Sequence, residues 1–157
     1  MQTTFKRLQF SSRDNGRTPF QWDGTTNTGF TSGTPWIKVA PNYKTINAAA
    51  EEKDPNSCLN YFRRLVKLRT DNIPVLVYGK YTLLDKANLK VYAYTREAEG
   101  QTMLILLNFS ASPTRADIAL NLSSATLLLS NYDEALLLST GKSKLTLKPY
   151  QAVIYKL

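Results

Sequence analysis

The spacing of apolar and polar residues divides the chain near Asn72. From Val75 onward apolar residues recur with the two-residue period of strands, and turn residues interrupt them at short intervals. This pattern predicts strands at residues 76–84, 89–96, 102–109, 114–120, 125–130, 143–147 and 151–156. Short strands joined by connections of a few residues are typical of an antiparallel β-sandwich.

The alternation is clearest in residues 91–96. Two sets of side chains alternate there: Val91, Ala93 and Thr95 against Tyr92, Tyr94 and Arg96. We expect the two sets to lie on opposite faces of a sheet. The leucine runs at 127–129 and 136–138 are interpreted as neighbouring buried strands rather than as a repeat.

Two helices are predicted before the strands. Asn47 is a candidate N-cap for a short helix that begins at Ala48. Asp54, directly before Pro55, predicts the start of a second helix that runs to Asp71. One face of this helix is apolar and the other is basic: Cys58, Tyr61, Phe62, Leu65, Val66 and Leu68 against Arg63, Arg64 and Lys67. Because such a helix is marginal alone in water, it must pack on another element.

Residues 1–46 show little periodicity and are rich in Gly, Pro, Asn, Thr and Asp. They are predicted to form a long irregular segment with short local turns. A loop of this length is unusual inside an independent domain. We therefore interpret it as a functional loop on a scaffold that lies outside this chain.

Composition narrows the possible chemistry. The chain is 43% hydrophobic and 20% charged, as in globular proteins, and no apolar run approaches the roughly 20 residues of a membrane span. It has no histidine and one cysteine, Cys58, which excludes a Ser-His triad and an intrachain disulfide and leaves almost no ligands for zinc. No metal or cofactor is expected, and Cys58 is interpreted as a small apolar helix residue.

The formal net charge of +8 makes nucleic-acid binding an alternative hypothesis, which predicts salt-dependent retention on DNA. The basic residues are spread along the chain, however, and the densest group lies on the second helix, where a solvated or interdomain face is the favoured interpretation. We therefore expect no nucleic-acid and no membrane partner. The first ten residues lack the apolar core of a secretion signal, which favours a cytoplasmic location.

The densest mixture of charge, turn residues and rings is the run from Ser12 to Trp22, Ser-Arg-Asp-Asn-Gly-Arg-Thr-Pro-Phe-Gln-Trp. Gly29-Phe30-Thr31 and Pro35-Trp36-Ile37 follow it. In this order the motifs resemble the late part of oligo-1,6-glucosidases and related α-glucosidases of the α-amylase superfamily. The resemblance implies that residues 1–72 are the long loop and last helix of a (β/α)8 barrel. It implies that residues 73–157 are the Greek-key β-sandwich called domain C.

The same resemblance implies a fragment of a retaining glycoside hydrolase. In the family the nucleophilic Asp, the acid/base Glu and a third Asp lie on barrel strands upstream of this motif, so no catalytic residue is assigned here and the isolated chain is predicted to be inactive. The partners of the intact protein would be short α-gluco-oligosaccharides and the missing barrel. Arg13 is the position that reaches the terminal glucose in the family, with structural bridging as the alternative.

The remaining motif residues are interpreted as structural. Asp14, Asn15 and Arg17 would brace the loop, while Trp22 and Trp36 would anchor it against the barrel rather than serve as sugar platforms. A catalytic pair of Asp14 and Asp23 is weighed against turn capping and ion pairing with Arg13 or Arg17. Capping and pairing are favoured, because a loop does not hold two carboxyl groups rigidly.

A second hypothesis makes the sandwich a carbohydrate-binding or purely stabilising module. Its candidate residues are Tyr78, Tyr81, Tyr92 and Tyr94, for which packing is the favoured interpretation. A chain cut away from its barrel would also expose the apolar face around Phe62. We therefore expect either self-association of the fragment or a loosely held first third.

Overall fold

The computed structural model describes residues 14–133 and 143–157. The chain forms two compact units, of which the first ends at Phe62 and the second comprises Arg63–Leu157. Each unit is described by itself. The expected strand at 136–138 lies outside the described residues.

From Asp14 to Ser57 the first unit is mainly irregular, as the sequence predicts. This part contains two short 3₁₀-helices, η1 (Asp14–Gly16) and η2 (Thr26–Gly29), and one short α-helix, α2 (Ala48–Lys53). The predicted N-cap of α2 is confirmed, because the side-chain oxygen of Asn47 accepts a hydrogen bond from the amide of Ala50 at 2.9 Å.

Helix α3 (Cys58–Asp71) begins three residues later than predicted. Its first turn is satisfied by side chains that the prediction did not use. The hydroxyl of Ser57 accepts from the amide of Asn60 at 3.2 Å, and a carboxylate oxygen of Glu51 accepts from the amide of Leu59 at 3.0 Å. The start of α3 is therefore fixed by a serine cap and by a carboxylate from α2.

The prediction that Asp54 caps the helix is wrong. Its carboxylate instead accepts a hydrogen bond from the amide of Asn56 at 2.9 Å, two residues further on. Such a local turn competes with helix formation for the same carboxylate. Pro55 consequently lies in a turn, and Cys58 is an exposed residue at the beginning of α3.

The first predicted strand also begins too early. Residues Ile73–Leu76 form the short helix α4, which has Pro74 in its first turn, and strand β1 begins only at Lys80. Asn72 separates α3 from α4, and its side chain donates to the carbonyl of Leu68 at 2.8 Å. The spacing of apolar residues cannot reveal helix α4, because a short apolar run fits a helix and a strand equally well.

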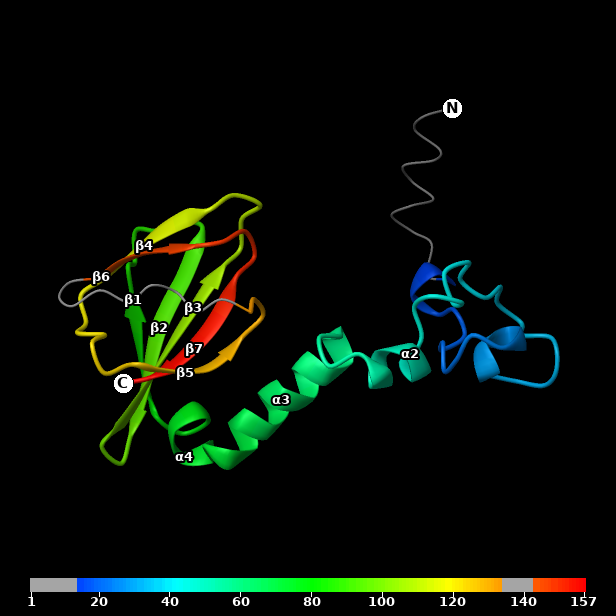
Figure 1. The fold of residues 1–157 in the computed structure, drawn as a ribbon, viewed down its shortest axis with the longest axis horizontal. Helices are drawn as coiled ribbons and strands as arrows, with labels where there is room; N and C mark the ends of the chain where they lie inside the picture. Colours follow the sequence, from blue (N-terminus) through cyan, green and yellow to red (C-terminus); the bar gives the residue numbers. More distant parts are fainter. Residues whose placement is uncertain (1–13, 134–142) are drawn as a thin grey trace. The chain divides into compact units, whose positions relative to one another are not determined.

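All the other predicted strands within the described residues are confirmed to within a few positions. After β1 (Lys80–Leu84) they are β2 (Val91–Ala98), β3 (Gln101–Asn108), β4 (Thr114–Ile118), β5 (Thr126–Ser130), β6 (Ser143–Leu147) and β7 (Ala152–Lys156). One sheet has the order β1-β2-β3-β7-β5, and β4 pairs with β6 in a second sheet. Every pairing is antiparallel (Figure 1).

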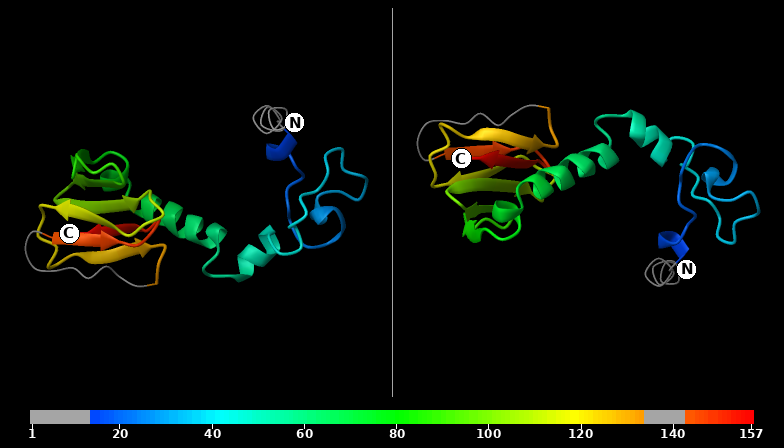
Figure 2. Two further views of the ribbon diagram at one scale, coloured as in Figure 1. Left: turned by 90° about the horizontal axis from the view of Figure 1, so that it is seen from above. Right: turned by 90° about the horizontal axis from the view of Figure 1, so that it is seen from below.

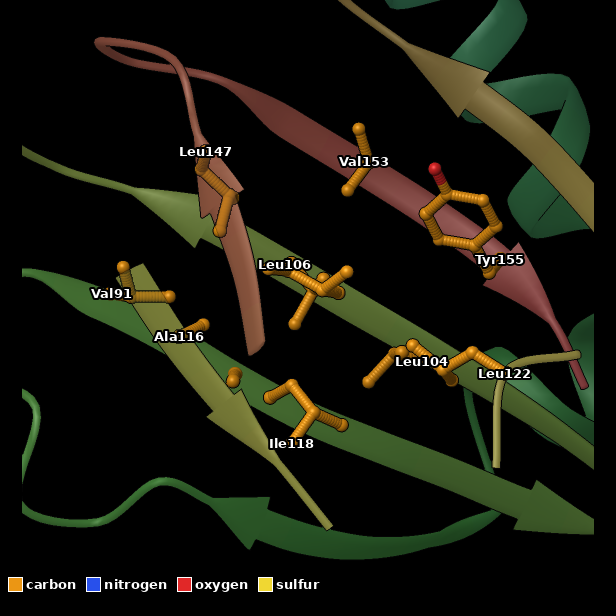
Figure 3. Close-up of a cluster of buried hydrophobic side chains, with 11 residues drawn as sticks. Val91, Leu104, Leu106, Ala116, Ile118, Leu122, Leu147, Val153 and Tyr155 are labelled. Atoms are coloured by element: carbon orange, nitrogen blue, oxygen red, sulfur yellow. The ribbon is translucent and has the colours of Figure 1, made fainter. Parts of the chain in front are cut away.

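The two sheets form a sandwich whose layers can be followed in both views of Figure 2. Side chains from both sheets face one another in the core (Figure 3). The fully or almost fully buried members are Val91, Ala93, Leu104, Leu106, Ala116, Ile118, Leu122, Leu145, Leu147, Val153 and Tyr155. The expected mainly β fold with an antiparallel sandwich is therefore confirmed.

Strand β2 shows the predicted alternation, since Val91, Ala93 and Thr95 are buried while Tyr92 is exposed. Strand β3 differs, because its apolar residues are buried on both faces. Leu104 and Leu106 point into the sandwich core, and the residues between and before them, Ile105 and Met103, are also buried. The outer face of the five-stranded sheet is therefore covered in part.

Helix α4 provides cover on that outer face. It contacts β2 and β3, and its Val75 is buried. Among the described residues, no helix combines the length and the hydropathy needed to cross a bilayer.

Candidate functional site

The predicted site residues lie at the start of the chain, where the structure describes only part of them. Ser12 and Arg13 lie outside the described residues, as does the side chain of Asn15. Asp14 begins η1 and accepts the amide of Arg17 with its backbone carbonyl at 3.0 Å, and both side chains are exposed. The predicted sugar contact of Arg13 therefore stays a prediction.

Two aromatic residues of the motif lie together. The rings of Phe20 and Trp22 have centroids 4.6 Å apart at an interplanar angle of 60°, and each residue is 56% exposed. Trp36 is 96% exposed. Whether Trp22 and Trp36 anchor the loop against a barrel concerns elements outside this chain, so that interpretation also stays a prediction.

Thr28 fixes the backbone beneath the Phe20–Trp22 pair. Its carbonyl accepts the amides of Trp22 at 2.9 Å and Asp23 at 3.1 Å. Its side chain is fully buried, and its hydroxyl donates to the carbonyl of Phe20 at 2.9 Å. The pair is therefore attached to a loop that is held by its own hydrogen bonds and by the start of α2, where the amide of Ala49 donates to the carbonyl of Trp22 at 2.9 Å.

This loop turns through three consecutive residues with positive φ, Asn27 at 54°, Thr28 at 60° and Gly29 at 66°. The amide of Phe30 closes the turn on the carbonyl of Asn27 at 3.0 Å, and the Asn27 side chain donates to the carbonyl of Gly33 at 2.8 Å. For a residue with a Cβ the left-handed conformation costs about 1–2 kcal/mol, and strain of this kind concentrates at functional sites.

Sequence reasoning missed Thr28. Asn and Gly tolerate a left-handed backbone, so Asn27 and Gly29 signal a turn, but a β-branched residue between them gives no such signal. Its role follows only from the fold of the loop.

The side chain of Asp23 forms hydrogen bonds within the same loop. Its carboxylate accepts the amide of Thr25 at 2.8 Å and the Thr25 hydroxyl at 2.5 Å, and these hydrogen bonds hold the pKa of Asp23 below its usual value. A Cβ on Gly29 would lie 2.6 Å from the same carboxylate. The predicted turn-capping role of Asp23 is confirmed.

A second group of aromatic residues lies on strands β1 and β2. The hydroxyls of Tyr81 and Tyr92 are 3.0 Å apart, and the ring of Tyr94 lies 5.4 Å from the first and 4.9 Å from the second, measured between centroids. We call these three residues the tyrosine cluster. They include three of the four tyrosines that the sequence singled out, and the fourth, Tyr78, is exposed.

A shallow hollow of 450 Å³ lies beside β4. It is lined by Asp85, Ala87, Asn88, Arg115, Asp117 and Lys144. One carboxylate oxygen of Asp85 accepts from the Asn88 side chain at 2.8 Å and from the amide of Asp117 at 3.1 Å. These bonds tie the β1–β2 loop to the second sheet. Within residues 14–133 and 143–157 no group of three His, Cys, Asp or Glu residues could hold a metal ion.

Comparison with protein families divides the chain at the beginning of β1. Residues 1–79 match the family model described as alpha amylase, catalytic domain, and residues 81–154 match the C-terminal domain of maltogenic amylase. Helix α4 thus belongs to the first match although it packs on the strands of the second.

Similar proteins extend the match over almost the whole chain. An oligo-1,6-glucosidase from Halalkalibacterium halodurans is 41% identical over 98% of this chain, and a trehalose-6-phosphate hydrolase from Bacillus subtilis is 38% identical over 96%. The solved structure of an isomaltulose synthase from Protaminobacter rubrum is 44% identical over 92% of the chain, with a TM-score of 0.79. The chain spans only 27% of each of the first two proteins and 26% of the third.

Proposed function

Since this chain belongs to the α-amylase family, we propose that it is the C-terminal part of a retaining α-glucosidase that releases α-linked glucose from short oligosaccharides. The observation that carries the proposal is the match to an oligo-1,6-glucosidase, which includes 98% of this chain but 27% of that protein. In this proposal residues 1–72 end the catalytic barrel and residues 73–157 form the C-terminal sandwich domain.

The contribution of this chain to catalysis is a wall of the glucose pocket. Arg13 binds hydroxyls of the terminal glucose, because a guanidinium presents several donors in a rigid fork and stays charged at every relevant pH. Asp14, Asn15 and Arg17 brace the segment that holds it.

The chemical step belongs to the part of the parent protein that precedes this chain. A retaining glycosidase needs two carboxyl groups about 5–5.5 Å apart, one as nucleophile and one as acid and base. The described part of the motif offers no such pair, because the Asp23 carboxylate is engaged by Thr25 and Asp14 is exposed on a short 3₁₀-helix. The isolated chain therefore has no hydrolytic activity.

A chimera tests the proposal. The upstream part of the Halalkalibacterium halodurans oligo-1,6-glucosidase is joined to this chain at Met1, in place of its own aligned segment. We expect the chimera to release nitrophenol from nitrophenyl α-glucoside and the isolated chain to release none. A folded chimera without activity contradicts the proposal. So does turnover by the isolated chain that is lost on changing Asp14 or Asp23.

The isolated chain is also proposed to self-associate, because Phe62 and Val66 of α3 are large apolar side chains that are exposed. Light scattering of the purified chain should detect species larger than a monomer. A cytoplasmic location of the parent is part of the proposal, and fractionation of cells that express the parent tests it.

A further inference from the structure

The second sheet carries the hollow beside β4 on its outward face. Along β4, Ala116 and Ile118 are buried in the sandwich core. Because side chains alternate along a strand, Arg115 and Asp117 point the other way, and both are exposed. Lys144 on β6 is the register partner of Asp117. Three charged side chains from two adjacent strands therefore form one wall of the hollow.

The other wall of the hollow is the β1–β2 loop, which hydrogen bonds hold in place. The Asn88 side chain donates to the carbonyl of Arg115 and to a carboxylate oxygen of Asp85, both at 2.8 Å. Its oxygen accepts two backbone amides next to the start of β2. The same oxygen of Asp85 accepts the amide of Asp117 at 3.1 Å. The loop is thus fixed to β4 before any ligand binds, as a preorganised site requires.

Most of the polar groups that face the hollow are unused in the described part of the chain. The side chains of Arg115, Asp117 and Lys144 form no hydrogen bond or ion pair within residues 14–133 and 143–157. Asp85 uses one of its two carboxylate oxygens there. Two carboxylates, a guanidinium and an ammonium are therefore available to a ligand.

The formal charges around the hollow cancel. Asp85 and Asp117 carry negative charges, and Arg115 and Lys144 carry as many positive ones. An anion or a cation would be attracted by one pair of charges and repelled by the other. A neutral hydroxyl group, in contrast, donates to a carboxylate and accepts from a guanidinium or an ammonium. The lining therefore favours a neutral ligand with several hydroxyl groups over an ion.

The size of the hollow suits a small ligand of this kind. Its 450 Å³ lies within the range of about 300–1,000 Å³ that is usual for small-molecule sites. The methyl group of Ala87 and the aliphatic stems of Arg115 and Lys144 offer apolar contacts to the C–H groups of a sugar ring. The described residues that line the hollow include no aromatic ring, so we expect a weak complex with a Kd on the order of 1 mM.

We propose that the hollow beside β4 binds a short α-gluco-oligosaccharide through its hydroxyl groups. Asp85 and Asp117 accept hydrogen bonds from the sugar, and Arg115 and Lys144 donate to it. Recognition of hydroxyl groups follows from the hollow itself, whereas the choice of glucose units rests on the proposed function. The site differs from the tyrosine cluster, whose residues the sequence offers for the same kind of ligand.

Saturation-transfer NMR of the full chain with maltotriose tests the proposal. The method observes the ligand, so self-association of the chain does not hide binding. We expect saturable transfer with a Kd on the order of 1 mM. Because maltotriose is neutral, this Kd should not depend on salt, whereas binding of an ion through its charge is screened. Inorganic phosphate or calcium that displaces maltotriose at concentrations below the Kd of the sugar would make the hollow an ion site and overturn the proposal.

A charge variant with a matched control locates the bound sugar. Asp117→Ala combined with Lys144→Met removes a cross-strand pair from the hollow without changing the net charge of the chain. It should weaken maltotriose binding by about tenfold or more, because hydrogen bonds to charged groups are lost. Glu97→Ala combined with Lys80→Met removes an exposed cross-strand pair of β1 and β2 that does not line the hollow. This control should bind maltotriose like the unchanged chain.

A second variant fills the hollow and leaves its charges in place. Ala87→Leu adds bulk at an exposed lining position, so it should also weaken binding without disturbing the core. Ala111→Leu, at an exposed position outside the lining, is the control and should have no effect. Maltotriose binding that survives Ala87→Leu, or that falls as much in the controls as in the hollow variants, overturns the proposal.

The results separate this inference from the proposed function. A chain that shows no saturable binding of maltotriose overturns the inference, whether or not the chimera described above is active. Binding that both hollow variants weaken, together with a folded but inactive chimera, contradicts the proposed function and leaves the sugar site on the sandwich.

Discussion

Gly79 donates its amide to the carbonyl of Val75 at 3.1 Å, at the point where α4 leads into the sheet. A Cβ on Gly79 would lie only 2.3 Å from that carbonyl oxygen and 2.9 Å from the carbonyl oxygen of Glu97 on β2. The close approach of these backbones requires a residue without a side chain. It also holds α4 against the sheet at the beginning of β1.

Gly79→Ala is therefore expected to destabilise the chain by about 2–3 kcal/mol, because two backbone oxygens must move. Urea unfolding measures the change. Gly100→Ala in the β2–β3 turn is the matched control, since its Cβ would meet open space and only its φ of 71° is unfavourable. Gly100→Ala should lower the free energy of unfolding by only about 1 kcal/mol. A Gly79→Ala variant as stable as the control would show that α4 is not held tightly.

Leu106 and Leu89 provide a matched pair for the sandwich core. Leu106 is completely buried between the sheets and Leu89 is 98% exposed. Leu106→Ala should lower the free energy of unfolding by about 2–5 kcal/mol, through lost burial and the cavity left behind. Leu89→Ala should change it by less than about 0.5 kcal/mol. Equal effects in urea unfolding would mean that the sheets do not pack as described.

Asn108 is a buried side chain that links two turns at one end of the sandwich. Its amide group donates to the carbonyls of Ser112 and Lys148, both at 2.9 Å, and its oxygen accepts from the amide and hydroxyl of Ser110. Asn108→Asp should cost about 3 kcal/mol, because a carboxylate cannot donate and would face two carbonyl oxygens.

The control for Asn108 is Asn121→Asp. The exposed Asn121 side chain accepts the amide of Ser123 at 3.0 Å, an interaction that a carboxylate retains. The free energy of unfolding of the Asn121→Asp variant, measured in urea, should stay within about 0.5 kcal/mol of that of the unchanged chain. If Asn108→Asp changed the free energy of unfolding equally little, the four hydrogen bonds of the Asn108 side chain would contribute little to stability.

Because of the tyrosine cluster, we expect the free energy of unfolding to decrease at alkaline pH. The hydrogen bond with Tyr92 is the main cause that raises the pKa of Tyr81 to about 12, with burial and the neighbouring phenols adding to it. Because the folded state holds this proton more tightly than the unfolded state, the contribution is complete below about pH 10. It is then lost as the pH rises toward 12.

Titration of phenolate absorbance and urea midpoints between these pH values measures this effect. Tyr92→Phe removes the shared hydrogen bond, so Tyr81 should titrate nearer its ordinary pKa and the alkaline loss of stability should shrink. Tyr78→Phe is the control, because Tyr78 is exposed on the segment before β1. An unchanged titration in Tyr92→Phe would show that the phenols do not share a proton.

Arg13 is tested in the chimera. Arg13→Lys should reduce kcat/KM by about 10- to 100-fold, the loss expected when a charged side chain no longer forms its hydrogen bonds with substrate. Lysine keeps the charge but lacks the planar fork. Arg17→Lys, at a position assigned to bracing, should lower the Tm more than it lowers kcat/KM. The reverse pattern in the two variants would exchange their roles.

The sequence predicted the strands well because each inward residue is followed by an outward one, as Val91, Tyr92 and Ala93 show, and burial of one face follows from that period. It also predicted Asn47 as a cap, since the capping bond joins residues three positions apart. The carboxylate of Asp23 was assigned correctly for the same reason, because its partner Thr25 is a near neighbour.

Other features depend on residues that are distant in sequence or on the path of the backbone. The start of α3 uses Glu51 from another helix, and Thr28 adopts a left-handed backbone that its side chain alone would disfavour. Likewise, Tyr81 lies opposite Arg96 in the strand register, and only the fold of the sheet brings its hydroxyl to that of Tyr92, 11 positions away in the sequence. The amino-acid sequence by itself thus determined the periodic elements and the family motif, because both are local patterns. The tertiary structure decided which tyrosines meet, which face of β3 is covered by α4 and how the motif loop is held, because these depend on contacts that no local pattern encodes.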